Sequence, residues 1–479
     1  MLRRRIFLFA FFLGIPLHAQ TMTLSTYYGA EGSTSGIAIA ADPFGNAYQV
    51  STTTAPGLPC SGQLTGKQNV LVTMVDSSQS VVWCTYLGGV RTDYGNGIAL
   101  DASGNIYVAG MTNSPRLGTP GAYQSSLMGT DDAFVAELNS SGSLQWLTYL
   151  GMAGSSQANA IYVDSAGGIY LVGYTTGNAW PVAGGVNQTT YGGGGSDIAI
   201  AKLNPGGSSL AWSGYVGGGS TDVGYGLALS PDGSTECVDG YTQSLNYPTT
   251  PGAFQSVRSA ERAAVVTCVN ASTGATVSST YFGGKTRIGQ QCNACAAGVT
   301  FDTSGNVWIV GLAQNENGFP ITGDAWQPQF GGGLHDAFIS ELTPDLSTVL
   351  YSTWFGGGGD DGAVAPAFDA NGNLWIHGNS FSQDLPVTAD AFQSANGGPA
   401  QTSDAYLLEM SPTGVEYATY LGGSNNEFGG ATQSLAVGPG IVWFTGWTQS
   451  PDLPLVNAFD GNLDGSEAAF IGELTGLGK

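Results

Sequence analysis

The chain has 479 residues, with 12 Lys and Arg against 35 Asp and Glu, so its formal net charge is −23. A surface this acidic repels nucleic acid and anionic lipid, and we expect neither as a partner. Only 10% of the residues are charged whereas 42% are hydrophobic, which excludes a disordered acidic tail and indicates a folded chain.

The first twenty residues have the pattern of a secretory signal peptide. Three arginines precede an apolar run from Ile6 to Leu17, and Leu17-His18-Ala19 offers a cleavage site. A membrane anchor is the weaker interpretation, because a span needs roughly 20 apolar residues. We therefore expect residues 1–20 to be a signal peptide, residues 21–479 to be one exported domain without a membrane span, and a secreted, periplasmic or cell-surface location.

A short motif then recurs along the chain. Thr-Tyr-Leu-Gly-Gly stands at residues 85–89 and again at 419–423. Relaxed copies begin at Thr26, Thr148, Gly214, Thr280 and Thr353, which makes seven in all. A fixed internal period is typical of repeat folds, in which each unit packs on the next.

Each unit reads as four short strands. In the second unit these are 97–101, 106–110, 133–138 and 144–150. The Asp-x-x-Gly-Asn letters at 101–105 predict a tight hairpin between the first two strands, and they recur from Asp42, Asp302 and Asp369. Seven four-stranded units of about 60 to 70 residues predict an all-β fold, a seven-bladed β-propeller.

The two ends of the chain supply one shared blade. The last unit has a third strand at 468–474 but no fourth, whereas the chain opens with an unpaired strand at 22–28. We expect the N-terminal strand to pair with the C-terminal blade and close the ring, which leaves no long exposed edge.

These repeats resemble a known family. Thr-Tyr-Leu-Gly-Gly, Asp-x-x-Gly-Asn-x-Tyr, a loop such as Thr250-Pro-Gly-Ala-Phe-Gln255 and Asp132-Ala-Phe-Val-Ala-Glu-Leu-Asn139 together are similar to the SBBP-type β-propeller repeat of exported and cell-surface bacterial proteins. The Asp-x-x-Gly-Asn part is also similar to NHL-type propellers. The resemblance implies a seven-bladed propeller and brings no fixed catalytic residues with it.

Six cysteines follow the signal peptide, and an even count in an exported chain favours disulfides. Proximity in the sequence suggests the pairs Cys60–Cys84, Cys237–Cys268 and Cys292–Cys295, although six cysteines allow fifteen pairings. Cys292-Asn-Ala-Cys295 also has the spacing of a redox motif, but it lies in a loop of an all-β pattern, where disulfide pairing is the favoured interpretation.

Acids recur in the loops that join the fourth strand of one unit to the first strand of the next. Carboxylates from several blades at a channel mouth suit Ca²⁺, and the candidates for such a site are Asp93, Asp222 and Asp360. The favoured alternative is that each acid accepts backbone N–H bonds from its own glycine-rich loop. Beyond Ca²⁺ we expect no cofactor.

The longest and most varied loops join the second and third strands, and loops on a rigid scaffold usually carry binding. They contain the tryptophans Trp180 and Trp326, and basic residues gather in these and the acid-bearing loops. The predicted binding face comprises Arg91, Asp93, Trp180, Asp222, Arg287, Trp326, Asp360, Asp361 and Glu427.

Catalytic motifs are not evident in the sequence. Only His335 and His377 follow the signal peptide, and neither belongs to a nucleophile or metal-ligand spacing. We therefore expect a monomeric binding module for a glycan or protein at the cell surface, more so than an enzyme. The alternatives are a polysaccharide lyase or hydrolase that uses face carboxylates, and a purely structural module of the cell envelope.

Overall fold

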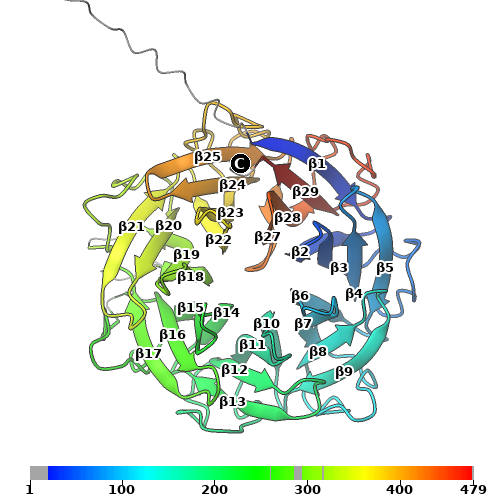
Figure 1. Cartoon of the computed structure of the whole chain (residues 1–479), viewed down its shortest axis with the longest axis vertical. Helices are drawn as coiled ribbons and strands as arrows, with labels where there is room; N and C mark the ends of the chain where they lie inside the picture. Colours follow the sequence, from blue (N-terminus) through cyan, green and yellow to red (C-terminus); the bar gives the residue numbers. More distant parts are fainter. Residues whose placement is uncertain (1–19, 259, 285–293, 316–317, 477–479) are drawn as a thin grey trace, which may run out of the picture.

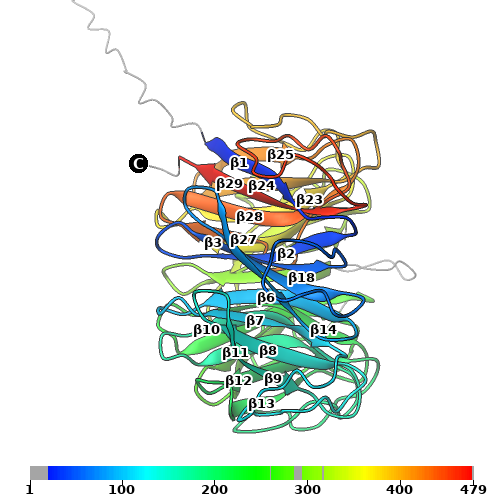
Figure 2. The same cartoon turned by 90° about the vertical axis from the view of Figure 1, so that its right-hand side faces the viewer.

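The chain forms a ring of seven β-sheets, seen face-on in Figure 1 and edge-on in Figure 2. The computed structural model describes residues 20–258, 260–284, 294–315 and 318–476. These residues contain 29 β-strands and no helix. The predicted seven-bladed propeller is confirmed, and in each blade the first strand lies at the centre and the fourth at the rim.

The first three blades follow one another along the chain. Their strands are β2 (Thr34–Ala41), β3 (Ala47–Thr53), β4 (Asn69–Val75) and β5 (Val81–Leu87) in blade 1; β6 (Asp93–Leu100), β7 (Ile106–Thr112), β8 (Asp132–Leu138) and β9 (Leu144–Leu150) in blade 2; and β10 (Ser156–Val163), β11 (Ile169–Thr175), β12 (Asp197–Leu203) and β13 (Leu210–Val216) in blade 3.

Blades 4 to 6 repeat the same antiparallel order. Their strands are β14 (Asp222–Leu229), β15 (Thr235–Thr242), β16 (Ala263–Asn270) and β17 (Thr276–Phe282) in blade 4; β18 (Ala294–Phe301), β19 (Val307–Gln314), β20 (His335–Leu342) and β21 (Val349–Phe355) in blade 5; and β22 (Asp361–Phe368), β23 (Leu374–Ser380), β24 (Asp404–Ser411) and β25 (Gly414–Leu421) in blade 6.

Blade 7 joins the two ends of the chain. It consists of β26 (Glu427–Gly429), β27 (Leu435–Gly438), β28 (Ile441–Thr448) and β29 (Ala468–Thr475), with the N-terminal β1 (Thr21–Tyr28) as its outer strand. β1 pairs antiparallel with β29 from Thr21–Thr475 to Tyr28–Ala469. The predicted closure of the ring by the N-terminal strand is therefore confirmed.

The repeated hairpin has the geometry that its sequence predicts. Asp101 Oδ1 accepts the backbone N–H groups of Ser103 and Asn105 at 2.8 and 2.9 Å. Gly104 has a φ of 79°, which a side chain would disfavour. The Asp-x-x-Gly-Asn letters therefore fix the turn between β6 and β7.

The hydrophobic core lies between neighbouring blades. Each sheet is covered on both faces, so its middle strands read as nearly continuous apolar runs rather than alternating ones. Val70 and Val72 of blade 1, for example, belong to one buried cluster with Ile98 and Val108 of blade 2. This cluster therefore belongs to two neighbouring blades at once.

A segment of blade 7 crosses the central channel. The inner strand of this blade is broken into β26 and β27, and the residues between them lie toward the centre of the ring (Figure 1). The Gln433 side chain donates a hydrogen bond to the backbone oxygen of Ile161 in blade 3 at 2.8 Å. Its own backbone oxygen accepts the N–H of Ile39 in blade 1 at 2.8 Å. A third bond runs from the Thr432 hydroxyl to the backbone oxygen of Tyr225 in blade 4 at 3.4 Å. This segment, which we call the channel plug (residues 430–434), thus ties blade 7 to blades 1, 3 and 4.

The loops between second and third strands run down the outer rim of the ring, and we call them rim loops. In blade 2 the rim loop spans residues 113–131. Its Thr119 N–H bonds to the Leu147 oxygen, and its Gln124 oxygen accepts the Tyr149 N–H, both at 3.0 Å. The rim loop thus covers the free edge of β9, as an exposed edge strand requires.

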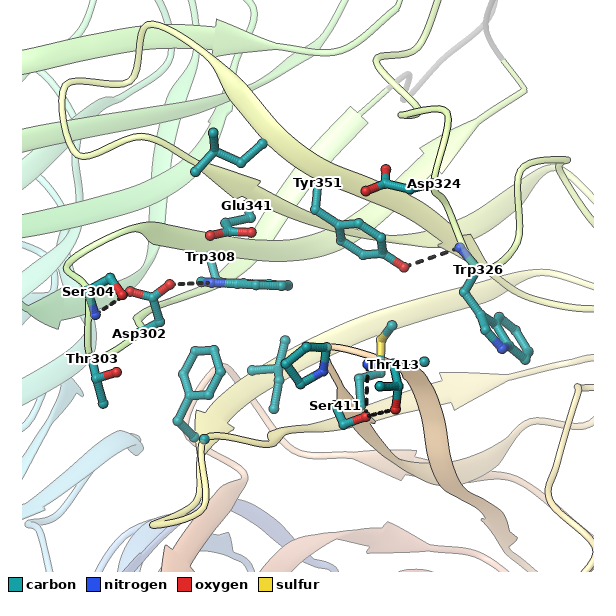
Figure 3. Close-up of a pocket in the computed structure, with 17 residues that line it drawn as sticks. Asp302, Thr303, Ser304, Trp308, Asp324, Trp326, Glu341, Tyr351, Ser411 and Thr413 are labelled. Carbon is teal, nitrogen blue, oxygen red and sulfur yellow. Dashed lines mark hydrogen bonds between the residues drawn. The ribbon is translucent and has the colours of Figure 1, made fainter.

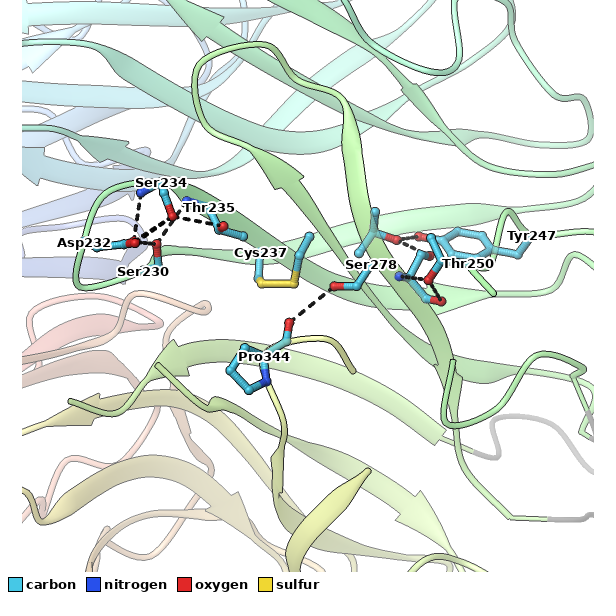
Figure 4. The surroundings of a disulfide bond; sticks show 12 residues. Ser230, Asp232, Ser234, Thr235, Cys237, Tyr247, Thr250, Ser278 and Pro344 are labelled. Carbon is cyan, nitrogen blue, oxygen red and sulfur yellow. Dashed lines mark hydrogen bonds between the residues drawn. A yellow bond between two sulfur atoms is a disulfide. The ribbon is translucent and has the colours of Figure 1, made fainter. Parts of the chain in front are cut away.

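Two of the three predicted disulfides are present in the described part of the chain. Cys60–Cys84 joins the rim loop of blade 1 to β5, and Cys237–Cys268 joins the neighbouring strands β15 and β16 (Figure 4). Close to the second disulfide, the Ser278 hydroxyl lies 3.5 Å from the backbone oxygen of Pro344 in blade 5. The predicted Cys292–Cys295 pair is not tested, because Cys292 lies outside the described residues.

Candidate binding site

The acids that open the first strands are buried. Asp93, Asp222, Asp361 and Glu427 are at most 3% exposed. Each accepts a backbone N–H from the preceding Gly-Gly loop; Asp222 Oδ2, for example, accepts the Gly218 N–H at 2.7 Å. Burial raises the pKa of all four side chains. The arrangement is the loop-capping one, and these four carboxylates do not reach the surface of the predicted binding face.

The remaining polar members of that face are more exposed. The Asp360 side chain is 40% exposed, and one of its carboxylate oxygens lies 3.8 Å from His335 Nδ1. The Arg91 side chain is exposed and lies near the Asn113 backbone oxygen. Arg287 lies outside the described residues. Within the described part of the chain, no three His, Cys, Asp or Glu side chains gather as a set of metal ligands.

Trp180 belongs to the core and not to a binding surface. Its side chain is 2% exposed, and its indole N–H donates to the Ile200 oxygen at 3.2 Å. The prediction of Trp180 as a surface residue is corrected here, because its rim loop folds inward against blade 3. The burial leaves Trp326, which is 39% exposed, as the accessible tryptophan of the two.

Trp326 lies on the rim, away from Asp93 and Asp222, because the rim loop of blade 5 carries it along β21. The backbone N–H of Gln327 donates to Thr353 Oγ1 at 2.9 Å and holds the loop on that strand. Trp326 shares a surface hollow with Gly356 and Gly357 of the loop that precedes Asp360 and Asp361, whereas Asp93 and Asp222 belong to blades 2 and 4.

At two blade junctions, the rim-loop residue before the glutamine donates a backbone hydrogen bond to the next blade, whereas in blades 5 and 6 this residue donates to a tyrosine of its own blade. In blade 2, the Tyr123 N–H donates to the Gly207 oxygen in the turn between the third and fourth strands of blade 3, at 3.0 Å. In blade 4, the Phe254 N–H donates to the Leu346 oxygen of blade 5 at 2.8 Å. Trp326 occupies the same position of the repeat, but its N–H donates to Tyr351 Oη of its own blade at 3.2 Å.

The junction between blades 5 and 6 remains open because the facing turn is short. Only Pro412 and Thr413 separate β24 from β25, whereas residues 343–348 separate β20 from β21. A Cβ on Gly414 would approach Trp326 Cδ1 to 3.1 Å, so this turn borders the indole.

The resulting hollow, which we call the blade 5/6 cleft, encloses about 490 Å³ (Figure 3). It is lined by residues of both blades: Asp302, Thr303, Ser304, Trp308, Asp324, Trp326, Glu341, Leu350, Tyr351, Phe368, Gly372, Leu374, Met410, Ser411, Pro412, Thr413 and Gly414.

Aromatic rings and acids dominate the chemistry of this cleft. The Trp308 ring packs on Phe368 and Tyr351, with centroids 5.7 and 6.1 Å apart. Among the lining residues, the ionisable side chains other than Tyr351 are all acidic, and Figure 3 shows the Glu341 carboxylate close to the Trp308 ring. Burial raises the pKa of Glu341, and the nearby charge of Asp302 raises it further. Such a cleft offers flat apolar surfaces together with hydrogen-bond acceptors.

The two acids at the inner end of the cleft are part of the repeat. Asn306 Nδ2 donates to Asp302 Oδ2 at 3.1 Å and to Glu341 Oε1 at 2.7 Å. The same bonds recur elsewhere, from Asn105 to Asp101 and from Asn373 to Glu409, both at 2.8 Å. Because other blades carry this arrangement without the cleft, it is explained by the fold and is no sign of a catalytic acid pair.

A scan against family models matched the SBBP β-propeller repeat at residues 82–115 and 145–178. The two matches fall on the repeats of blades 1 to 3, whose geometry recurs around the ring. The chain therefore contains SBBP β-propeller repeats. No curated protein matched the chain. Among the described residues, no helix is long and apolar enough to cross a bilayer.

Solved structures resemble the chain only distantly. Hydrazine synthase of Kuenenia stuttgartiensis has 12% identity and a TM-score of 0.44 over 88% of this chain and 94% of that one. A protein of unknown function from Dyadobacter fermentans has 11% identity and a TM-score of 0.41 over 82% and 99%. The quinohemoprotein alcohol dehydrogenase of Comamonas testosteroni has 9% identity and a TM-score of 0.40 over 96% and 77%. At these scores the comparisons give no information about function.

Proposed function

We propose that the protein is an exported, non-enzymatic binding module that holds a neutral glycan in the blade 5/6 cleft. The observation that carries the proposal is the blade 5/6 cleft, in which a half-exposed Trp326 faces a short turn of the next blade. Export is supported by the signal-like sequence at residues 1–20 and by the two disulfides.

The chemistry of the lining favours a neutral glycan. Sugar rings present C–H faces that pack on aromatic rings, and hydroxyl groups that donate to carboxylates such as Asp324 and Glu341. The acidic lining and the net charge of −23 disfavour a polyuronate, whose carboxylates would be repelled. The proposal thus moves the binding site from the predicted loop face to the rim.

The test is retention of the protein on neutral, amino-bearing and uronate-bearing polysaccharides, with new reducing ends measured in parallel. We expect retention on a neutral polysaccharide without new reducing ends. Trp326→Ala should weaken the affinity about tenfold or more, as the loss of a central aromatic contact does.

Tyr123→Ala is the matched control, because Tyr123 holds the same repeat position in a closed junction and is similarly exposed at 37%. It should bind like the unaltered protein. Equal binding by the Trp326 variant would contradict the placement of the site, and new reducing ends would contradict the absence of catalysis.

A further inference from the structure

Two repeated positions meet at each blade junction. One lies at the start of a third strand, as its first residue or, in blade 5, its second, and the other is the first residue of the next blade's first strand. At three junctions both residues are acids, and we call them the acid pairs: Asp197 with Asp222, Asp336 with Asp361, and Asp404 with Glu427.

The two carboxylates of a pair border the same small volume. A Cβ on Gly217 would lie 2.7 Å from Asp197 Oδ1 and 2.9 Å from Asp222 Oδ2. At the second pair, a Cβ on Gly356 would lie 2.5 and 2.8 Å from the corresponding oxygens of Asp336 and Asp361. Gly422 has the same two kinds of neighbour at the third pair.

In each pair, Oδ1 of the third-strand aspartate is buried without a hydrogen-bond partner in the described part of the chain, and at the second pair Asp361 Oδ1 is as well. Asp197 Oδ2 accepts the Gly192 N–H at 2.6 Å and the Gln188 amide at 3.1 Å. Asp197 Oδ1 has no partner within the described part of the chain, and the residue is 0% exposed. Asp336 and Asp404 show the same arrangement. A bare carboxylate oxygen buried beside a second carboxylate is strongly unfavourable.

At the other junctions, at least one of the two positions is occupied by a residue that is not an acid. In blade 2, Asp132 faces Ser156 instead of an acid, and its Oδ1 accepts the Gly129 N–H at 3.0 Å. In blade 1 the equivalent residue is an asparagine. Asn69 Oδ1 accepts the Gly66 N–H at 3.1 Å, and Asn69 Nδ2 lies 3.5 Å from Asp93 Oδ2. The asparagine thus places a donor where the acid pairs have the bare oxygen.

We propose that each acid pair shares one proton, so that the third-strand aspartic acid donates a hydrogen bond to the acid of the next blade. The protonated carboxyl then places a hydrogen-bond donor beside the neighbouring acid, as the Asn69 amide does at the first junction. Three of the blade junctions are therefore stabilised by a shared proton. This proposal does not depend on the proposed glycan site.

The pKa directions agree with this geometry. Burial, together with the charge of the partner acid, raises the pKa of Asp197, Asp336 and Asp404 to about 7. An unfolded aspartic acid titrates near pH 3.9, so the folded state holds protons that the unfolded state releases. The stabilisation is complete below about pH 4, declines as the pH rises, and is lost above about pH 7.

Other charged and titratable groups also face the acid pairs, and most of them are acids or tyrosines. They are Arg258, Tyr191, Tyr215, Tyr247 and Tyr281 at the first pair; Asp360, Asp384, Tyr406 and Tyr420 at the second; and Asp452 and Tyr27 at the third. None of the acids or tyrosines in this set supplies a positive charge that would favour two ionised carboxylates, and Arg258 acts on the first pair alone.

The test is the pH dependence of thermal unfolding in the full protein and in the triple variant Asp197→Asn, Asp336→Asn and Asp404→Asn. We expect the Tm of the unaltered protein to be about 5 °C lower at pH 8 than at pH 5. The triple variant should lose at least half of this difference, because its amides donate at every pH. Should the triple variant not fold, each single variant should remove part of the difference.

Asp132→Asn is the matched control. Its carboxylate accepts hydrogen bonds on both oxygens, so the new amide should lower the Tm at both pH values and leave the pH difference intact. An unchanged pH difference in the acid-pair variants, or a loss of Tm at pH 5 equal to that of the control, would overturn the proposal. A Tm restored by Ca²⁺ at pH 8 in the unaltered protein alone would also overturn it, in favour of a bound cation. In the infrared spectrum at pH 6, a neutral-carboxyl band should be present in the unaltered protein and reduced in the variants.

Discussion

At the three acid pairs, the first glycine of the repeated motif (Gly217, Gly356 and Gly422) has a steric role. Gly217 is not in the left-handed region, so its role is not conformational freedom. A Cβ on this residue would lie 2.5 Å from Asp197 Cγ, closer than any real contact. The glycine provides room for the two carboxylates that join one blade to the next.

Gly217→Ala should lower the free energy of unfolding by about 2 to 4 kcal/mol, because the added methyl group displaces Asp197 from its buried position. Chemical denaturation measures this change. Gly461→Ala is the control, since nothing lies within 4 Å of a Cβ there, and it should change the stability by less than about 1 kcal/mol. A Gly217 variant as stable as the control would contradict this role.

The two loop tryptophans show what an alignment of the repeats can and cannot predict. Trp180 stands eight residues before the rim-loop glutamine Gln188, and the residues eight before Gln255, Gln327 and Gln393 are Tyr247, Phe319 and Leu385, all at most 8% exposed. In blade 2 the equivalent residue, Leu117, stands seven before Gln124. That recurring apolar position identifies Trp180 as a core residue. Trp326 is one residue before its glutamine, at the rim position of Tyr123 and Phe254, so its exposure was predictable from the same alignment.

At the scale of elements, the strands and their hairpins follow from the sequence, but their inner ends do not. The second unit was expected to begin at residue 97, whereas β6 begins at Asp93, because its first residues continue the pairing beyond an irregularity between Gly95 and Gly97. The channel plug was not predicted. Its only signal is that Glu427 and Gly440 are two residues further apart than Asp93 and Gly104, and length alone does not show where extra residues go.

The rim loop of blade 1 depends on its disulfide. Cys60–Cys84 holds this loop on β5, together with the Ser61 N–H bond to the Cys84 oxygen at 2.8 Å. The bond closes a loop with a sequence separation of 24 residues. Replacing both cysteines by serine should cost about 3 kcal/mol of stability.

This prediction is checked by denaturant unfolding of the double variant, with hydrogen exchange used to locate the change. The amides of the blade 1 rim loop should lose protection first, while those of blade 4, which has its own disulfide, should not. An undiminished stability, or a loss of protection spread evenly around the ring, would show that the disulfide does not act on this loop.

At the scale of the whole molecule, the repeat count and the unpaired terminal strand determine a closed ring, and both were readable in the sequence. The candidate cleft was not, because it depends on a comparison between two blades: a rim aromatic in blade 5 and the length of the turn in blade 6. Trp326 is the predicted binding residue that lines it. The functional proposal rests on this cleft, in which the exposed Trp326 faces the short turn of blade 6.

Binding in the blade 5/6 cleft is tested most directly by hydrogen exchange of the whole protein with and without the neutral polysaccharide that it retains. We expect protection in two segments that are distant in sequence, the rim loop around Trp326 and the turn at Ser411–Gly414. The exchange of the equivalent segments of blades 2 and 3 should be unchanged. Protection confined to the loops that carry Arg91 and Asp360, or to the mouth of the central channel, would contradict the claim that the ligand binds at the open junction.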